Sequence, residues 1–245
     1  MLTAYRCSVA LGSEHLSRSS VRYDLLQRLA DSARRRDVAI LAFGLGRDEV
    51  RVVLEGAPRE REAVILGMKS GTARSLASAG AVILWDDTER IEATPAILPA
   101  TVAWAHTVPG VDDPLATPWT SHRDLLGFRH ARFFDAEGLR ARVDPAEVHR
   151  LAGGGPLPRV RRNALGAQLD ALLRVAAAVL GVSPGDRACN RLFVQLARAQ
   201  GYPSGSIEDA LLLGARRVRQ LSQHQDPLLP VAEVHLSDQR LMQLP

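Results

Sequence analysis

The order of extended and helical segments in the first half of the chain constrains the fold most. Short apolar runs rich in β-branched side chains predict strands, and apolar residues repeating every three or four positions predict helices. In chain order these patterns predict strand, helix, strand, strand, helix and strand at residues 3–11, 21–36, 37–43, 50–54, 61–79 and 81–85. Because this is the order of a ferredoxin-like or RRM-like palm, we expect an α+β fold in which helices pack on an antiparallel sheet.

Glycine, proline and arginine mark the end of this palm. We place the palm domain at residues 1–150 and interpret residues 151–166 as a linker. A small helical domain with a helix-turn-helix-like pattern is expected at 167–221, with its three helices at 167–180, 190–199 and 207–221. Residues 222–245 resemble a tail with one extended piece at 231–236.

Composition excludes several classes of protein. The chain has 245 residues, 46% hydrophobic and 24% charged, which suits one large or two modest globular domains and argues against disorder. No apolar stretch reaches the roughly 18 residues of a membrane span. The first residues also lack the apolar core of a signal peptide, so we expect a cytoplasmic protein without membrane insertion. Cys7 and Cys189 stand alone, without the spacing of a metal site.

The charge of the chain permits an acidic partner such as DNA without requiring one. The net charge is +4, and Lys69 is the only lysine, so the abundance of arginine indicates a GC-rich coding bias as much as phosphate binding. We therefore choose candidate DNA contacts by where the arginines cluster, in the hinge and on the last predicted helix. They are Arg159, Arg161, Arg162, Arg216 and Arg219. The last two are three residues apart and share one face of a predicted helix, although such a face is often simply solvated.

Two phosphate-binding signatures are incomplete. Gly44 and Gly46 follow a predicted strand, as in a dinucleotide-binding loop, but Glu49 stands where a third glycine is needed. Gly67 and Lys69 resemble the end of a P-loop, but a methionine separates them. We expect neither site.

One segment, residues 117–127, is distinctive. Its sequence, TPWTSHRDLLG, is similar to the W-P-W-S-S-H-x-x-x-L-G run that REP-associated single-tyrosine (HUH-type) transposases carry after their catalytic helix. The matched positions are Pro118, Trp119, Ser121, His122, Leu126 and Gly127. Weaker similarity extends over residues 1–135, so the palm resembles that of this family. The run is a structural loop in the family, and we interpret Trp119 and His122 as packing residues.

The resemblance also indicates what this chain has lost. The family cleaves single-stranded DNA with a tyrosine nucleophile and a divalent metal held by two histidines on one strand. Glu49 and Arg51 occupy the histidine positions, and arginine offers no lone pair to a metal. Ile97, in a helix expected at 95–105, occupies the position of the nucleophile, and the tyrosines lie elsewhere, at Tyr5, Tyr23 and Tyr202. We therefore expect no catalytic residue, no metal and no cofactor.

The C-terminal helices are similar to the helix-turn-helix that longer members of the family append. The likeness covers residues 172–182, 191–199 and 214–221. The start of the family's base-reading helix corresponds to Ile207, Glu208, Asp209 and Ala210, and two carboxylates there would face DNA phosphates. Inherited sequence-specific reading of bases is therefore disfavoured.

These observations favour a domesticated, catalytically inactive transposase-like protein that binds DNA or acts as a regulator. The alternative is a protein-interaction scaffold that has abandoned both DNA surfaces and docks a partner on its palm, helical domain or tail. An active nuclease with a different metal site is the third and least favoured hypothesis.

Overall fold

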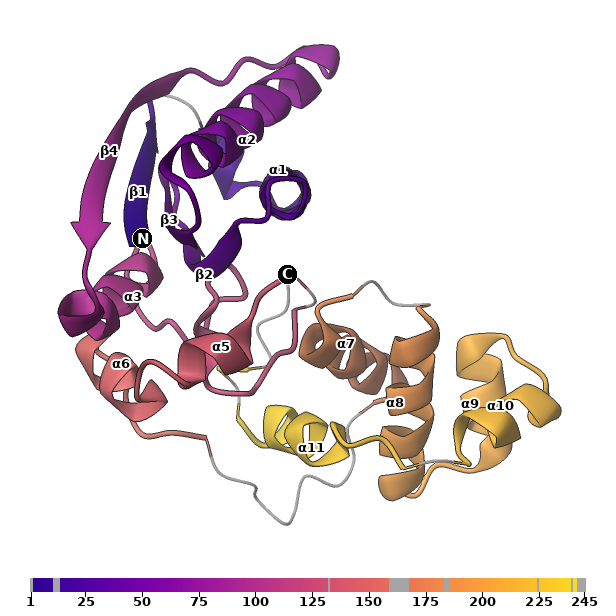
Figure 1. Cartoon of the computed structure of the whole chain (residues 1–245). Helices are drawn as coiled ribbons and strands as arrows, with labels where there is room; N and C mark the ends of the chain where they lie inside the picture. Colours follow the sequence, from indigo (N-terminus) through magenta and orange to yellow (C-terminus); the bar gives the residue numbers. More distant parts are fainter. Residues whose placement is uncertain are drawn as a thin grey trace. The chain divides into compact units, whose positions relative to one another are not determined.

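The computed structural model describes residues 2–10, 14–131, 133–158, 168–182, 186–223, 225–238 and 240–241 (Figure 1). The chain divides into two compact units. The N-terminal unit comprises Met1–Pro114, Pro118–Leu125 and Phe133–Gly155. The C-terminal unit comprises Leu115–Thr117, Leu126–Arg132 and Pro156–Pro245.

The N-terminal unit contains a four-stranded antiparallel sheet, so the expected α+β fold with an antiparallel sheet is confirmed. Its strands are β1 (Leu2–Val9), β2 (Ala39–Leu45), β3 (Glu49–Glu55) and β4 (Trp85–Ala93). They lie in the order β2-β3-β1-β4, and each neighbouring pair is antiparallel. The two central strands are therefore β1 and β3.

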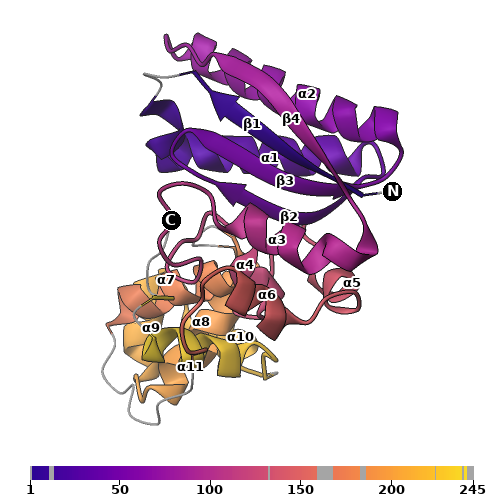
Figure 2. The ribbon, with the colours of Figure 1, turned by 90° about the vertical axis from the view of Figure 1, so that its left-hand side faces the viewer.

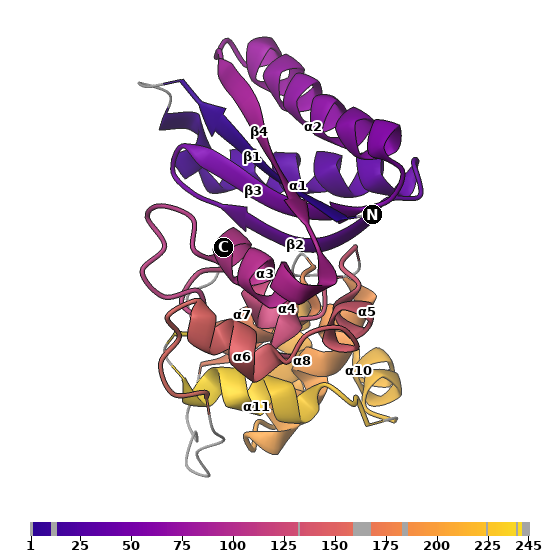
Figure 3. The ribbon, with the colours of Figure 1, turned by 60° about the vertical axis from the view of Figure 1, so that its left-hand side comes forward.

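Two long helices cover one face of this sheet. They are α1 (Ser19–Arg34) and α2 (Pro58–Ser78), which pack against each other and lie behind the strands in Figures 2 and 3. Their apolar residues recur at helical spacing, as at Val21, Leu25 and Leu29, and those side chains are buried. The arrangement agrees with the expected packing of helices on an antiparallel sheet.

The last strand of the sheet differs from the sequence prediction. A strand was expected at residues 81–85, but β4 begins only at Trp85 and carries mostly charged residues. In the preceding apolar run Ile83 is buried, whereas Val82 and Leu84 are 67% and 64% exposed. Among the described strands β4 pairs only with β1, so it is an edge strand of this sheet, and edge strands are commonly charged instead of apolar. The prediction was wrong because it followed hydrophobicity alone.

The opposite face of the sheet receives a short helix. After a 3-10 turn, Pro95–Ile97, helix α3 (Leu98–His106) packs on β2 and β3. A Cβ atom on Gly44 of β2 would lie 2.0 Å from the backbone oxygen of Ala105, so this close approach requires glycine. The unit also has a 3-10 turn at Glu14–Ser17 and three shorter α-helices, namely α4 (His122–Leu125), α5 (Ala136–Arg140) and α6 (Pro145–Leu151).

The C-terminal unit is helical in its described parts. Its helices are α7 (Leu169–Leu180), α8 (Arg187–Ala199), α9 (Ser204–Leu211), α10 (Ala215–Leu221) and α11 (Leu229–Ser237). Apolar side chains from all five helices form its core, among them Val175, Phe193, Ile207, Val218 and Ala232. None of the helices that the structure describes is long and apolar enough to cross a membrane.

Two sequence predictions in this unit were wrong. The single helix expected at 207–221 is interrupted, because Leu212 adopts a left-handed conformation (φ 52°) that ends α9. The extended piece expected at 231–236 is part of α11, which begins with Pro230 in its first turn, a position that proline favours. The buried residues of α11 are Ala232 and His235, which are three positions apart, as expected for one face of a helix. The segment 231–236 is too short for this spacing to be recognised from the sequence.

Candidate functional site

The face of the sheet on which α3 packs carries a row of interacting charged side chains. Side chains alternate along a strand, and Tyr5 and Cys7 face α2, so Arg6 of β1 points to the opposite face. Arg6 pairs in register with Arg51 of β3 and therefore shares that face. Glu49, two residues before Arg51 on β3, lies between these two arginines, so this face holds both positions at which the family resemblance would place metal-binding histidines.

The Glu49 carboxylate joins the two arginines. It accepts a hydrogen bond from Arg6 Nε at 2.7 Å through one oxygen and from Arg51 Nε through the other. Arg6 also lies 3.3 Å from Glu89 of β4, at the exposed end of the series. Burial of Glu49 is thus compensated by two guanidinium groups, and the interaction raises the pKa of Arg6 above its ordinary value.

Arg51 is further held by helix α3. Its Nη1 atom donates to the backbone oxygens of Trp104 at 2.8 Å and Thr107 at 3.3 Å. Its guanidinium also lies over the Trp104 ring, 4.6 Å from the ring centroid, in cation–π geometry. Arg51 thereby ties β3 to the C-terminal end of α3, and its positive charge is balanced by Glu49.

Ile97, where the family resemblance would place the nucleophile, lies directly before α3. Ile97 ends the 3-10 turn before α3, and its backbone oxygen accepts from Thr101 Oγ1 at 2.9 Å. The tyrosines lie elsewhere, in β1, in α1 and between α8 and α9. Among the described residues, no three histidine, cysteine, aspartate or glutamate side chains form a group that could hold a metal.

The segment around Trp119 extends the sheet at its β2 edge. Thr120 forms an antiparallel bridge with Gly44, and the backbone nitrogen of Leu45 donates to the oxygen of Trp119 at 2.9 Å. The Trp119 ring is buried against the Tyr23 ring, edge to face, with 5.2 Å between centroids. The matched family segment thus covers backbone groups that an edge strand would otherwise expose.

Three buried histidines adjoin this segment. His122 of α4 lies between His106 of α3 and His149 of α6, and the exposed fractions of the three are 0%, 0% and 5% in that order. Nδ1 of His122 is 3.0 Å from Nδ1 of His106, and Nε2 of His122 is 2.8 Å from Nδ1 of His149. Burial, followed by the two neighbouring imidazoles, holds the pKa of His122 well below its ordinary value.

The remaining matched residues are distributed over both units. Pro118 precedes Trp119 in the N-terminal unit, whereas Leu126 and Gly127 belong to the C-terminal unit. Gly127 has φ 80°, a left-handed conformation that glycine adopts without strain. Sequence reasoning selected His122 but not its two partners, because no spacing pattern links residues so far apart in the chain.

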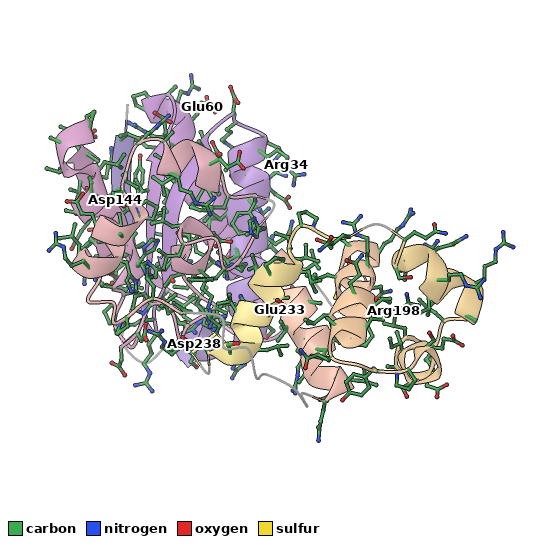
Figure 4. The ribbon with its side chains drawn as sticks, turned by 90° about the horizontal axis from the view of Figure 1, so that it is seen from below. Arg34, Glu60, Asp144, Arg198, Glu233 and Asp238 are labelled. Atoms are coloured by element: carbon green, nitrogen blue, oxygen red, sulfur yellow. The ribbon has the colours of Figure 1, made fainter. Side chains whose placement is uncertain are left out.

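The candidate DNA contacts fall into two groups. Arg159, Arg161 and Arg162 lie outside the described residues. Arg216 and Arg219 lie on α10, three residues apart, and both are exposed. Figure 4 labels a further exposed arginine, Arg198, near the C-terminal end of α8, which packs against α10.

The two acidic residues that the sequence comparison placed at the start of a base-reading helix, Glu208 and Asp209, belong to α9. Glu208 and Asp209 lie in the last turns of α9 and not at the start of a helix. Helix α10 begins six residues after Asp209, at Ala215, and its N-terminal residue is followed directly by Arg216 and Arg217.

No family model, curated protein or solved structure matches the chain.

Proposed function

We propose that this chain is a non-catalytic DNA-binding protein built on a transposase-like palm, and that its C-terminal unit contacts the DNA. The order of strands in the sheet, with a helix after β1 and another after β3, is that of a ferredoxin-like palm and supports the resemblance to single-tyrosine transposases. The separation of α9 and α10 by a short turn agrees with a helix-turn-helix ancestry.

The uneven distribution of charge carries the proposal. The C-terminal unit contains 13 arginines against 7 carboxylates, a net charge of +6, whereas the N-terminal unit contains 18 basic and 20 acidic residues, a net charge of −2. The whole positive excess of the protein therefore belongs to the helical unit. A concentrated excess of arginine is what binding to a phosphate backbone requires.

The non-catalytic part of the proposal rests on the contacts of Glu49 and Arg51. A metal ligand needs a lone pair, which the Arg51 guanidinium lacks, and the two guanidinium groups that bind Glu49 would repel a cation at its carboxylate. The nucleophile position holds Ile97, which has no nucleophilic atom. The charged series on this face has two positive and two negative members, so it offers little net attraction to a phosphate.

The experiment is an incubation of the full chain with labelled single-stranded hairpins and duplex DNA, with Mg²⁺ or Mn²⁺ present. We expect retarded complexes in a native gel, no nicked product and no covalent adduct in a denaturing gel. A tyrosine-linked oligonucleotide would overturn the non-catalytic part. Absence of any complex at low salt would overturn the DNA-binding part.

A protein-interaction scaffold is the second candidate, and β4 favours it. Within the part of the chain that the structure describes, this edge strand pairs with β1 only. Three large apolar residues beside it or on it are exposed, namely Val82, Leu84 and Ile91. An exposed strand edge is a template for pairing with another chain. Affinity capture from native lysate with and without nuclease distinguishes the two, because a scaffold keeps its partners after nucleic acid is digested.

A further inference from the structure

The three buried histidines form a continuous hydrogen-bonded series whose protons can be assigned from its two ends. At one end, Nε2 of His149 lies 2.6 Å from the backbone oxygen of Gly155, which can only accept. His149 must therefore carry its proton on Nε2, and in the neutral ring Nδ1 is an acceptor. His122 accordingly donates to it from Nε2 across 2.8 Å.

The same reasoning continues to the sheet. Since neutral His122 carries its proton on Nε2, its Nδ1 accepts from Nδ1 of His106. Nε2 of His106 is then an acceptor for the Ser121 hydroxyl at 2.9 Å, and Ser121 Oγ accepts in turn from the backbone N–H of Phe43 at 2.9 Å. Every donor in the series thus faces an acceptor when all three rings are neutral.

The series has a limited capacity for added protons. If one ring becomes an imidazolium, every ring between it and Ser121 moves its proton to the other nitrogen. The Ser121 hydroxyl then accepts from His106 and donates to the backbone oxygen of Phe43, 3.4 Å away. Each contact then still joins a donor to an acceptor. A second added proton has no such solution, because two N–H groups must face each other at a contact of 2.8 to 3.0 Å.

We propose that this series is an acid-opened latch that holds α6 and the turn after it against α3 and α4. Its links come from α3, α4, α6 and the segment that covers the β2 edge, so breaking one contact releases a packed helix. The turn is fitted closely to the latch, since a Cβ on Gly154 would lie 2.1 Å from Cε1 of His149. Gly155 is the last residue of the N-terminal unit, and the chain enters the C-terminal unit at Pro156.

The charged groups around the latch lie on α4, α5 and α6. The groups that act on the charge of His122 are His106 and His149, and both lower its pKa. On α4 itself the buried charged neighbours are Arg123 and Asp124, and Arg140 of α5 donates to the backbone oxygens of Asp124 and Leu125. On α6, Glu147 and Arg150 are exposed.

The direction of the pH dependence follows from the depressed pKa. An unfolded histidine titrates near pH 6.5, whereas burial and the two neighbouring imidazoles disfavour a proton on His122. The contribution of the latch to stability is therefore complete above about pH 6.5 and is lost as the pH falls. Each imidazole that only the opened state protonates raises the opening constant about tenfold per pH unit. With two excluded protons, we expect roughly a hundredfold increase per pH unit below about pH 6.

The first test reads the tautomers of the full chain by ¹⁵N NMR of its histidine rings at neutral pH. We expect His106 protonated on Nδ1 and His122 and His149 protonated on Nε2, with the His122 ring still neutral at pH 6.5 because its pKa is lowered. If His106 instead carries its proton on Nε2, or if the His122 ring titrates at its ordinary pKa in the folded protein, the latch is contradicted.

The second test measures urea unfolding between pH 7.5 and 5 for the parent, for His149→Gln and for His130→Gln. Glutamine can accept from His122 and donate to Gly155 but does not titrate, so we expect the His149→Gln variant to lose about one tenfold step per pH unit of acid sensitivity. The matched control, His130→Gln, removes an exposed histidine outside the series and should behave like the parent. Equal acid sensitivity in all three proteins would overturn the proposal, and the NMR test remains decisive if His149→Gln fails to fold.

Discussion

At the scale of single residues, Arg51 shows how one side chain changes what a sheet face can do. Its guanidinium group binds Glu49, the backbone of Trp104 and the Trp104 ring at once. A histidine at this position would present a lone pair to solvent, whereas arginine presents only donors. On this face of the sheet the Arg51 side chain therefore forms a structural contact between a strand and a helix.

This role predicts the effect of removing the Glu49 charge. Glu49→Gln leaves two guanidinium groups that share one neutral acceptor, so we expect a loss of about 2 kcal/mol in the free energy of unfolding, measured by urea denaturation. The matched control is Glu89→Gln, which removes the exposed carboxylate that also faces Arg6 and should cost below about 0.5 kcal/mol. Equal effects of the two variants would show that the Glu49 bridge is not structural.

The sequence predicted part of the candidate site. Glu49 and Arg51 could be placed on one strand face because side chains alternate along a strand. The partnership of His122 with His106 and His149 could not be predicted, since those residues come from three helices and no local pattern links them. Burial of polar groups against each other is a property of tertiary packing, which a single sequence does not display.

At the scale of elements, the β2 edge determines how α3 and the Trp119 segment are placed. Gly44 of β2 forms the bridge to Thr120 on its outer edge. Because Gly44 has no side chain, the end of α3 can also pack closely against this strand, on the sheet face opposite α1 and α2. One glycine therefore allows two segments to pack on the same strand.

Substitution of this glycine should be costly. In Gly44→Ala the new methyl group would meet a backbone oxygen at 2.0 Å, which cannot move without displacing α3, so we expect a loss of about 3 kcal/mol or more in the free energy of unfolding. The control is Gly205→Ala in α9, where nothing lies within 4 Å. That variant should be stabilised by about 0.5 to 1 kcal/mol, because alanine favours helices. A mild effect at Gly44 would mean that α3 does not pack as described.

The elements that were predicted are those with a strong pattern. The helices α1 and α2 bury apolar residues at helical spacing, and the strands β1 to β3 are buried along almost their whole length, so their apolar residues mark them. Strand β4 was displaced in the prediction because an edge strand exposed on both sides has no such period. Helix α11 was missed because nine residues with two prolines nearby give too short a signal.

At the scale of the whole molecule, charge and fold separate into two parts. The N-terminal unit is slightly acidic, with a net charge of −2, and the C-terminal unit carries +6. Binding to DNA through the C-terminal unit should therefore depend on salt, because each phosphate neutralised by an arginine releases a counterion. The overall net charge of +4 conceals this asymmetry, and for that reason composition alone could not locate the interface.

The most direct test of the central claim is a fluorescence-anisotropy titration of duplex DNA at several salt concentrations. It compares the parent, the double variant Arg216→Ala/Arg219→Ala, and the control Arg34→Ala/Arg90→Ala, which removes the same charge from exposed arginines of the N-terminal unit. If each of the first two arginines neutralises one phosphate, the slope of log K against log salt should fall by about 1.8. We expect this change for the α10 variant and a slope like that of the parent for the control. Equal slopes for all three proteins, or no binding at low salt, would contradict it.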